Sequence, residues 1–303
     1  MTLTELRYIV AVARHRHFGK AAEACFVSQP TLSVAVRKLE EELGIRLFER
    51  SHSDVLVTET GATIVAQAET VLRAAAGVHD IAEAARDPLG RQLTLGVIYT
   101  VGPYLVPRLI PGLKRHAPHL SLVVKENFTD ALAAQLKRGE LDAAIMSLPF
   151  ADPQLLSRPL YDEPFQVALP ADHRLAKRKR IAPADLAAET LLLLGARNCF
   201  RDQVIEVCPI GPVAGALQKT LEGSSLETIC QMVAMGAGIT LLPATMRIND
   251  DLTPHLAVRP FVSPPPTRTI AVFYRRGFAR PQIIQCLATV VREANLKGVD
   301  YCA

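Results

Sequence analysis

The spacing of apolar residues in the first 58 positions predicts three helices and then two short strands. An apolar stripe at helical intervals follows a capping box formed by Thr2 and Glu5, and a short second helix spans residues 18–25. A third helix begins at Ser28 and ends at Gly44, residue types that favour the two ends of a helix. Its inward face repeats at intervals of four, three and four: Leu32, Val36, Leu39 and Leu43. Residues 46–50 and 55–58 read as short strands around the turn 51–54, which predicts a β-wing.

The polar residues of the third helix indicate nucleic-acid binding. They lie outside the apolar face and supply an amide, hydroxyls and a guanidinium, the groups that base edges and phosphates require. With the short helix and tight turn before it, this pattern predicts a winged helix-turn-helix whose third helix enters the major groove. The expected DNA-contacting residues are Gln29, Pro30, Thr31, Ser33, Arg37 and, from the wing, Arg50. An ordinary three-helix subdomain with solvated polar residues is the alternative.

Residues 58–87 predict one long helix with a heptad seam. The seam consists of Ile64, Ala68, Val71, Ala75, Val78, Ala82 and Ala85. Such a seam predicts a homodimer, and packing against its own domain is the alternative. A two-fold dimer would present two reading helices roughly 34 Å apart, as a palindromic DNA site requires. The run Asp87-Pro88-Leu89-Gly90 breaks the helix and marks a domain boundary.

After residue 91 the pattern alternates between strands and helices, which predicts an α/β domain with a parallel sheet. The expected strands are 93–98, 120–126, 143–146, 165–169, 191–194, 238–243 and 269–274. The chain leaves one lobe near residue 163 and returns after the Pro-rich run 263–266. We therefore predict a DNA-binding domain over 1–58, a linker helix and hinge over 59–90, and an effector domain over 91–303. Its lobe I comprises 91–163 and 268–303, and its lobe II comprises 164–267.

Two hydroxyls follow neighbouring strands of this predicted sheet. Thr100 and Thr129 come where strands end and helices begin, the place where α/β sheets collect ligands. A hydroxyl at a helix start can equally be a cap. The sequence leaves both interpretations open.

Composition and charge narrow the class of protein. The 303 residues are 49% hydrophobic and contain no Trp. Residues 1–90 carry 10 Lys/Arg against 12 Asp/Glu, so DNA binding must depend on local placement and not on net charge. Residues 228–246 carry no charge, but Gly236, Gly238 and Pro243 interrupt them, which argues against a membrane span. The start of the chain lacks secretion-signal features, so a cytoplasmic protein is expected, and no Cys/His spacing indicates a metal.

Two cysteines stand nine residues apart, and the first is flanked by Arg197, Arg201 and Asp202. In an intact helix their thiols would lie on opposite faces, ~13.5 Å apart along the axis. A disulfide needs Cα atoms roughly 4.4–6.8 Å apart, so a bond between Cys199 and Cys208 would require the helix to unfold. Nearby guanidinium groups favour the thiolate, which is the form that peroxides attack. The spacing thus suggests a redox switch, and two unrelated buried cysteines are the alternative.

Several stretches together resemble the LysR-type transcriptional regulators. They are Val27-Ser28-Gln29-Pro30-Thr31-Leu32-Ser33, Leu39-Glu40, Leu43-Gly44, Leu47-Phe48-Glu49-Arg50, the run 139–145 and the run 236–243. The resemblance implies a winged helix, a linker helix and a two-lobed α/β effector domain like a periplasmic binding protein. It also implies homotetramers built from dimers, with double-stranded promoter DNA and RNA polymerase as partners.

Within that family, the motif Cys199-x-Arg201-Asp202-Gln203…Cys208 and the run 100–105 resemble the members that sense hydrogen peroxide. This resemblance implies that Cys199 is the peroxidatic cysteine, that Cys208 resolves it, and that a dithiol reductant resets the disulfide without any cofactor. The implied peroxide-binding residues are Thr100, Thr129, Asn198, Asp202 and Arg268. Position 198 is often His in these members. Asn cannot titrate near neutral pH, so the rate or pH dependence of sensing is open.

The main hypothesis is therefore a peroxide-sensing regulator in which oxidation refolds residues 195–210 and changes the DNA contacts. A second hypothesis is a conventional LysR-type regulator that binds a small organic effector between its lobes, without thiol dependence. A third is a thiol peroxidase that turns over with a reductant. The helix-turn-helix and the heptad seam argue against an enzyme.

Overall fold

The structure, a computed structural model, describes residues 1–50, 55–84, 87, 89–208, 223, 225–248 and 251–302. Within these ranges, the side chains of Arg50 and of residues 79–81 and 83–84 are not described. The chain divides into two compact units, Met1–Arg86 and Asp87–Ala303. The turn of the wing, Ser51 to Asp54, lies outside the described residues, as do Ala85 of the seam, Pro88 of the predicted break and positions 209–210 of the cysteine segment.

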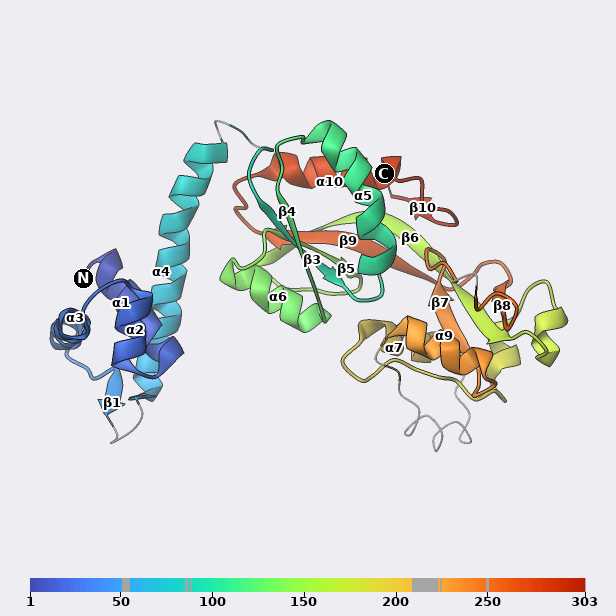
Figure 1. The fold of residues 1–303 in the computed structure, drawn as a ribbon, viewed down its shortest axis with the longest axis horizontal. Helices are drawn as coiled ribbons and strands as arrows, with labels where there is room; N and C mark the ends of the chain where they lie inside the picture. Colours follow the sequence, from blue (N-terminus) through green and yellow to red (C-terminus); the bar gives the residue numbers. More distant parts are fainter. Residues whose placement is uncertain are drawn as a thin grey trace. The chain divides into compact units, whose positions relative to one another are not determined.

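The first unit is a helix-turn-helix with a two-stranded wing and a long helix (Figure 1). Its elements are α1 (Leu3–His15), α2 (Phe18–Ala24), α3 (Gln29–Leu43), β1 (Phe48–Arg50), β2 (Val55–Val57) and α4 (Glu59–Ala84). The predicted ends are confirmed: Thr2 and Glu5 form a capping box, Ser28 caps α3, and Gly44 ends it in the left-handed region. β1 and β2 pair antiparallel, as a wing requires. Leu43 was expected inside but is 38% exposed, because the core ends one turn earlier at Leu39.

The heptad seam of α4 divides into two parts. Near its start, Ala68 is buried and Ile64 packs against the core of its own unit, as does Val65, which lies next to the seam. Further along, Val71 is 37% and Val78 is 67% exposed. Packing within the unit therefore accounts for the beginning of the seam, and the later positions present apolar side chains to solvent.

The second unit is built on a mixed sheet with the strand order β10-β6-β9-β5-β3-β4. The strands are β3 (Leu93–Ile98), β4 (Leu122–Asn127), β5 (Ala143–Ser147), β6 (Leu155–Pro170), β9 (Thr267–Arg275) and β10 (Asp300–Tyr301). β3 lies parallel to both β4 and β5, and the remaining pairs are antiparallel. Helices α5 (Gly102–His116) and α10 (Pro281–Glu293) pack together on one side of this sheet, and α6 (Thr129–Arg138) lies on the other (Figure 1).

Strand β6 runs through the whole second unit. Its first part pairs with β9, and from Phe165 onward it pairs with β7 (Thr240–Pro243) and β8 (Leu256–Pro260). Two apolar cores correspond to these two parts of the strand. One combines residues 93–161 with 270–296, and the other lies within residues 165–261. The single long strand replaces the separate strand predicted at 165–169, because a continuous strand that changes neighbours carries no break signal in its sequence.

A second correction concerns residues 191–194, which make isolated bridges to Ile239 and Gly223 and do not form a regular strand. The uncharged stretch 228–246 folds as expected, with α9 (Leu226–Ala234), a turn at Gly236 and the buried strand β7. The short 3₁₀ helices η1 (Arg174–Lys177) and η2 (Pro183–Leu186) complete this part.

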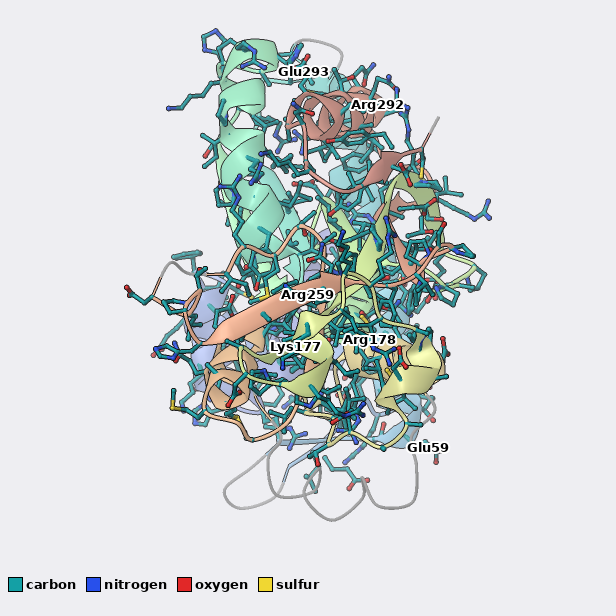
Figure 2. All side chains as sticks on the ribbon, turned by 90° about the vertical axis from the view of Figure 1, so that its right-hand side faces the viewer. Glu59, Lys177, Arg178, Arg259, Arg292 and Glu293 are labelled. Atoms are coloured by element: carbon teal, nitrogen blue, oxygen red, sulfur yellow. The ribbon has the colours of Figure 1, made fainter. Side chains whose placement is uncertain are left out.

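The basic run at 177–180 is exposed, as predicted for a solvated segment. Lys177 and Arg178 lie beside Arg259 of β8 (Figure 2). The Arg259 Nε donates to the carbonyl oxygens of Ala176 and Arg178, each at 3.0 Å. These bonds fasten η1 to the strand beneath it.

Candidate functional site

The cysteine segment forms the helix α7 (Cys199–Val207). Asn198 is its N-cap, and the Asn198 Oδ1 accepts a hydrogen bond from the Phe200 backbone N–H at 3.1 Å. Cys199 is the first helical residue and Cys208 is the C-cap. Both cysteines are free. With an intact helix between them, their thiols are separated by ~13.5 Å along the axis, too far for a disulfide.

The two cysteines pack into different cores. Cys199 is half-buried and contacts the core built on β3, β5 and α10. Cys208 is 5% exposed and belongs to the other core, with Phe200 and Val204 of its own helix. Burial raises the pKa of Cys208 to about 12, so this thiol is protonated and unreactive while the helix is folded.

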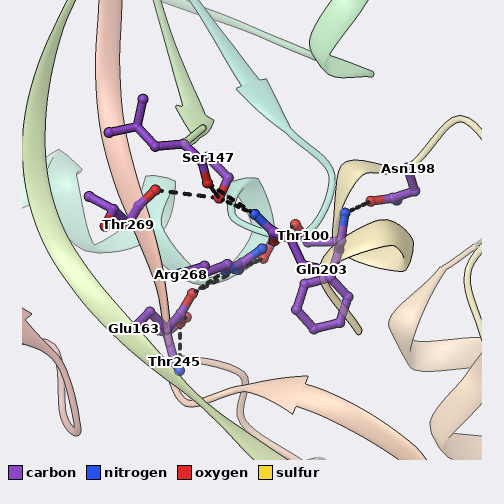
Figure 3. Close-up of polar contacts among 10 residues, drawn as sticks. Thr100, Ser147, Glu163, Asn198, Gln203, Thr245, Arg268 and Thr269 are labelled. Atoms are coloured by element: carbon purple, nitrogen blue, oxygen red, sulfur yellow. Dashed lines mark hydrogen bonds and ion pairs between the residues drawn. The ribbon is translucent and has the colours of Figure 1, made fainter. Parts of the chain in front are cut away.

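The carboxyl ends of three neighbouring parallel strands meet beside α7. Thr100 follows β3, Thr129 follows β4, and Ser147 ends β5. Gln203 of α7 reaches this edge, where its Nε2 donates to the Ser147 Oγ at 2.8 Å and to the Leu148 carbonyl at 3.2 Å (Figure 3). Because Gln203 lies one helical turn after Cys199, this contact turns the cysteine's face of α7 toward the strand ends.

Neither threonine acts as a helix cap. α5 has Val101 as its N-cap and α6 has Phe128, and neither of these caps makes a side-chain hydrogen bond. The Oγ1 of Thr129 is buried and has no hydrogen-bond partner among the described residues. The capping alternative therefore does not explain these hydroxyls.

Unused hydrogen-bonding capacity gathers at this edge of the sheet. The Oε1 of Gln203 is a buried acceptor without a partner in the part of the chain that the structure describes, and Thr129 offers a donor and an acceptor. Thr100 is 2% exposed, and its Oγ1 accepts a hydrogen bond from Arg268 Nη1 at 2.9 Å. Since arginine cannot accept, the hydroxyl proton of Thr100 remains available to another acceptor. Buried polar groups of this kind match a small molecule with two O–H donors and two oxygen acceptors.

Arg268 and Glu163 form a fully buried ion pair next to these groups (Figure 3). The Nε of Arg268 donates to the Glu163 Oε2 at 2.8 Å, and its Nη2 donates to the Thr100 carbonyl at 3.0 Å. The guanidinium also stacks over the Phe200 ring, with 4.9 Å between its Cζ and the ring centroid. Arg268 thus contacts both the strand end that carries Thr100 and the residue that follows Cys199.

The predicted site residues are therefore only partly brought together. Thr100 and Arg268 touch, and Asn198 is a buried helix cap beside Cys199. Asp202 lies in the first turn of α7 and is exposed. Arg201 turns back to the Leu194 carbonyl at 3.1 Å, and Arg197 stacks on Phe128 at 4.7 Å.

Sequence reasoning missed Gln203, Ser147 and Glu163. Gln203 belongs to the motif that carries the resemblance, and its spacing of four from Cys199 places it on the same helix face. Glu163 lies within a largely apolar strand, and only its register opposite Arg268 discloses its partner. That register cannot be read from the sequence.

Five of the DNA-contacting candidates belong to α3. Gln29, Pro30, Thr31 and Arg37 are exposed on α3, and Ser33 is half-buried. Their helix is held from behind by Leu32, Val36 and Leu39. The Glu40 Oε1 accepts hydrogen bonds from the backbone N–H groups of Leu47 and Phe48 at 2.7 and 3.1 Å, which ties α3 to the wing. The side chain of Arg50 lies outside the described residues.

No group of three or more His, Cys, Asp or Glu side chains in the described ranges could hold a metal ion. None of the described helices combines the length and the apolar character needed to cross a bilayer.

Comparison with known proteins relates both units to one family. Residues 3–62 match the family described as "Bacterial regulatory helix-turn-helix protein, lysR family", and residues 86–295 match "LysR substrate binding domain". The hydrogen peroxide-inducible genes activator of Pectobacterium carotovorum subsp. carotovorum is 43% identical over 97% of this chain and 96% of that protein. The DNA-binding transcriptional dual regulator OxyR of Escherichia coli (strain K12) is 42% identical, covering 98% and 97%.

Solved structures give the same relation. A full-length OxyR variant from Pseudomonas aeruginosa superposes with a TM-score of 0.77 at 48% identity, covering 98% of this chain and 96% of the other. A reduced form of OxyR from N. meningitidis gives a TM-score of 0.64 at 39% identity, covering 70% of this chain and all of the other.

Proposed function

Because this chain belongs to the LysR family of bacterial transcriptional regulators, we propose that it binds promoter DNA through α3 and takes hydrogen peroxide as its signal through Cys199 and Cys208. The observation that carries the sensing half is α7 itself. One helix holds two free cysteines at opposite ends, packs them into different cores, and borders a cluster of buried polar groups without partners.

The first chemical step joins the Cys199 sulfur to one peroxide oxygen. The thiolate attacks, the O–O bond breaks, and the departing hydroxide takes a proton to become water, which leaves a sulfenic acid. The Thr100 hydroxyl donates to the peroxide, Gln203 Oε1 accepts one of its protons, and Thr129 can do either. Arg268 holds Thr100 in place. Asn198 sets the start of α7, and Asp202 receives or returns a proton at its exposed side.

The second step forms the disulfide. Cys208, as a thiolate, attacks the sulfur of Cys199, the S–O bond breaks, and the leaving hydroxide becomes a second water. Two thiols thus supply the two electrons that reduce one peroxide. Since the folded helix keeps the sulfurs apart and Cys208 protonated, α7 must open first. Residues 195–210 refold as the bond closes.

The response reaches DNA through the other parts of the chain. Residues 1–58 act as the DNA-binding domain, 59–90 as the linker and hinge, and 91–303 as the effector domain with its two lobes. The exposed Val71 and Val78 of α4 support a homodimer through the linker helix, from which a tetramer is assembled. The refolded effector domain changes the spacing of the reading helices and the contact with RNA polymerase, and a cytoplasmic dithiol reductant resets the switch.

The protein is a sensor and not an enzyme. Each chain consumes about one peroxide until a reductant acts, because the closed disulfide has used both thiols and holds no electrons for a second peroxide. Steady-state turnover of many peroxides per chain each second would contradict this proposal and support a thiol peroxidase.

The decisive experiment is peptide mapping after one equivalent of hydrogen peroxide, with free thiols alkylated before digestion. A linked pair of peptides carrying Cys199 and Cys208 is expected. If both cysteines are recovered alkylated from folded protein, the peroxide mechanism is wrong, and a small organic effector bound between the lobes becomes the better explanation.

A further inference from the structure

The buried carboxylate of Glu163 is the part of this site that the peroxide chemistry leaves unused. It lies on β6 directly opposite Arg268 of β9, where the chain passes from one core to the other. Both side chains are fully buried, with 2.7 Å between Arg268 Nη2 and Glu163 Oε2. An isolated buried charge of either sign would be strongly unfavourable, so each of the two fixes the other.

Glu163 is also held from its second oxygen. The Oε1 accepts hydrogen bonds from the Thr245 backbone N–H at 2.9 Å and from the Thr245 hydroxyl. With Oε2 bound to Arg268, the carboxylate has little freedom to rotate. It therefore fixes the plane of the guanidinium, because a bound Nε and Nη2 determine where Nη1 points.

The direction of Nη1 decides what Thr100 can do. Nη1 donates to the Thr100 Oγ1, and Nη2 donates to the carbonyl of the same residue (Figure 3). The Thr100 Oγ1 thereby uses a lone pair to accept from Arg268, and because arginine cannot accept in return, the Thr100 hydroxyl must send its own proton elsewhere. Among the described residues, no other hydrogen-bond partner competes for that proton.

We propose that Glu163 is a positioning residue for peroxide reduction: it aims Arg268 at Thr100 and so turns the Thr100 hydroxyl into a donor toward the reacting oxygen. This inference rests on the proposed function. A donor fixed before the reaction stabilises the charge that develops on the departing oxygen. Without the carboxylate, Arg268 is free to turn, and the hydroxyl can rotate away from the reacting oxygen.

The role proposed for Glu163 should affect one reaction of Cys199 and not another. Reduction of peroxide needs a donor at the departing oxygen, whereas alkylation by iodoacetamide needs only the thiolate. In a Cys208→Ser background, Glu163→Gln should slow sulfenic acid formation by roughly tenfold or more and change the alkylation rate far less. The same substitution at Glu293, a surface carboxylate paired with Arg115 and His116, should change neither rate (Figure 2).

A double-mutant cycle tests whether Glu163 acts through Thr100. Thr100→Val removes the hydroxyl, so adding Glu163→Gln to it should produce no further loss of the peroxide rate. An equal loss in both reactions, or a full second loss in the Thr100→Val background, would mean that Glu163 only supports the fold. If Glu163→Gln does not fold, Glu163→Asp, which keeps the charge but shortens the reach, must show the same selective loss.

The proposed function and the role of Glu163 can be overturned separately. If the wild-type chain forms no sulfenic acid at Cys199, the proposed function is wrong. If it does, and folded Glu163→Gln forms it equally fast, only the role of Glu163 is overturned.

Discussion

The two ends of α7 carry the same residue type in opposite surroundings. At one end Cys199 borders a polar edge where three strand ends and a buried ion pair meet. At the other end Cys208 lies among Phe200, Val204 and other apolar side chains, where burial raises its pKa to about 12. The contrast teaches that reactivity here is a property of position. In the proposed mechanism, Cys199 is the thiol that meets the signal, and Cys208 becomes available only when the helix opens.

The largest expected effect comes from replacing one of the two cysteines at the ends of α7. Cys199→Ser should abolish both the disulfide and the peroxide-induced change in DNA footprint, since no sulfur remains for peroxide to attack. Cys208→Ser should still form a sulfenic acid that a dimedone probe traps. A peroxide-dependent footprint in folded Cys199→Ser protein would remove the distinction between the two thiols.

The second expected effect concerns the helix between them. Val204 is 2% exposed and helps to hold α7 against the core that contains Cys208. Val204→Ala should weaken that packing by about 2 kcal/mol and raise the open population of α7 roughly 30-fold. Stopped-flow measurement of disulfide closure after sulfenic acid formation should show a matching acceleration. Glu206→Ala, at an exposed position of the same helix, is the control and should close at the wild-type rate.

A third effect is the pH dependence of Cys208 alkylation in the reduced protein. The folded pKa of Cys208 is raised, so its contribution to the stability of α7 is complete below the unfolded pKa and is lost as pH rises toward 12. The alkylation rate should therefore keep increasing about tenfold per pH unit beyond pH ~9, where an exposed thiol levels off. The rate is measured by mass spectrometry of the Cys208 peptide after timed alkylation. An alkylation rate that levels off near pH 9 would show that the thiol is already accessible in the folded protein.

The smallest expected effect concerns DNA binding and should leave the two cysteines of α7 unchanged. Arg37 belongs to the unit Met1–Arg86 and is exposed on α3. Arg37→Ala should weaken DNA binding and lower the slope of log K against log salt by about one, without changing either cysteine's reactivity. Fluorescence anisotropy at several salt concentrations measures the slope. An unchanged slope and affinity would exclude Arg37 from the interface.

Local chemistry made much of this molecule predictable. Thr2, Ser28 and Gly44 mark helix ends through their own side chains or backbone freedom, so their roles can be read within a few residues. Thr100 and Thr129 could be placed at one edge because parallel strands align their carboxyl ends. The spacing of the two cysteines predicted that an intact helix would hold their thiols apart, and the structure has a helix, α7, between them.

What could not be predicted depends on pairing between distant segments. Glu163 and Arg268 are 105 positions apart, and Gln203 meets Ser147 across 56. Their partners follow from strand register and from the packing of α7, which no local pattern encodes. The full length of β6 could not be predicted for the same reason, since the strand changes its neighbours at Phe165 but is itself unbroken.

In the proposed mechanism, the burial of Cys208 also sets an upper limit on the peroxide concentration that the protein can report. A sulfenic acid waits while α7 opens, and during that interval a second peroxide can convert it to a sulfinic acid that a dithiol cannot restore. The opening rate of a nine-residue helix therefore defines the concentration above which signalling gives way to irreversible damage. A more stable α7 would lower that concentration. A less stable α7 would raise it, but would also open more often in the absence of peroxide.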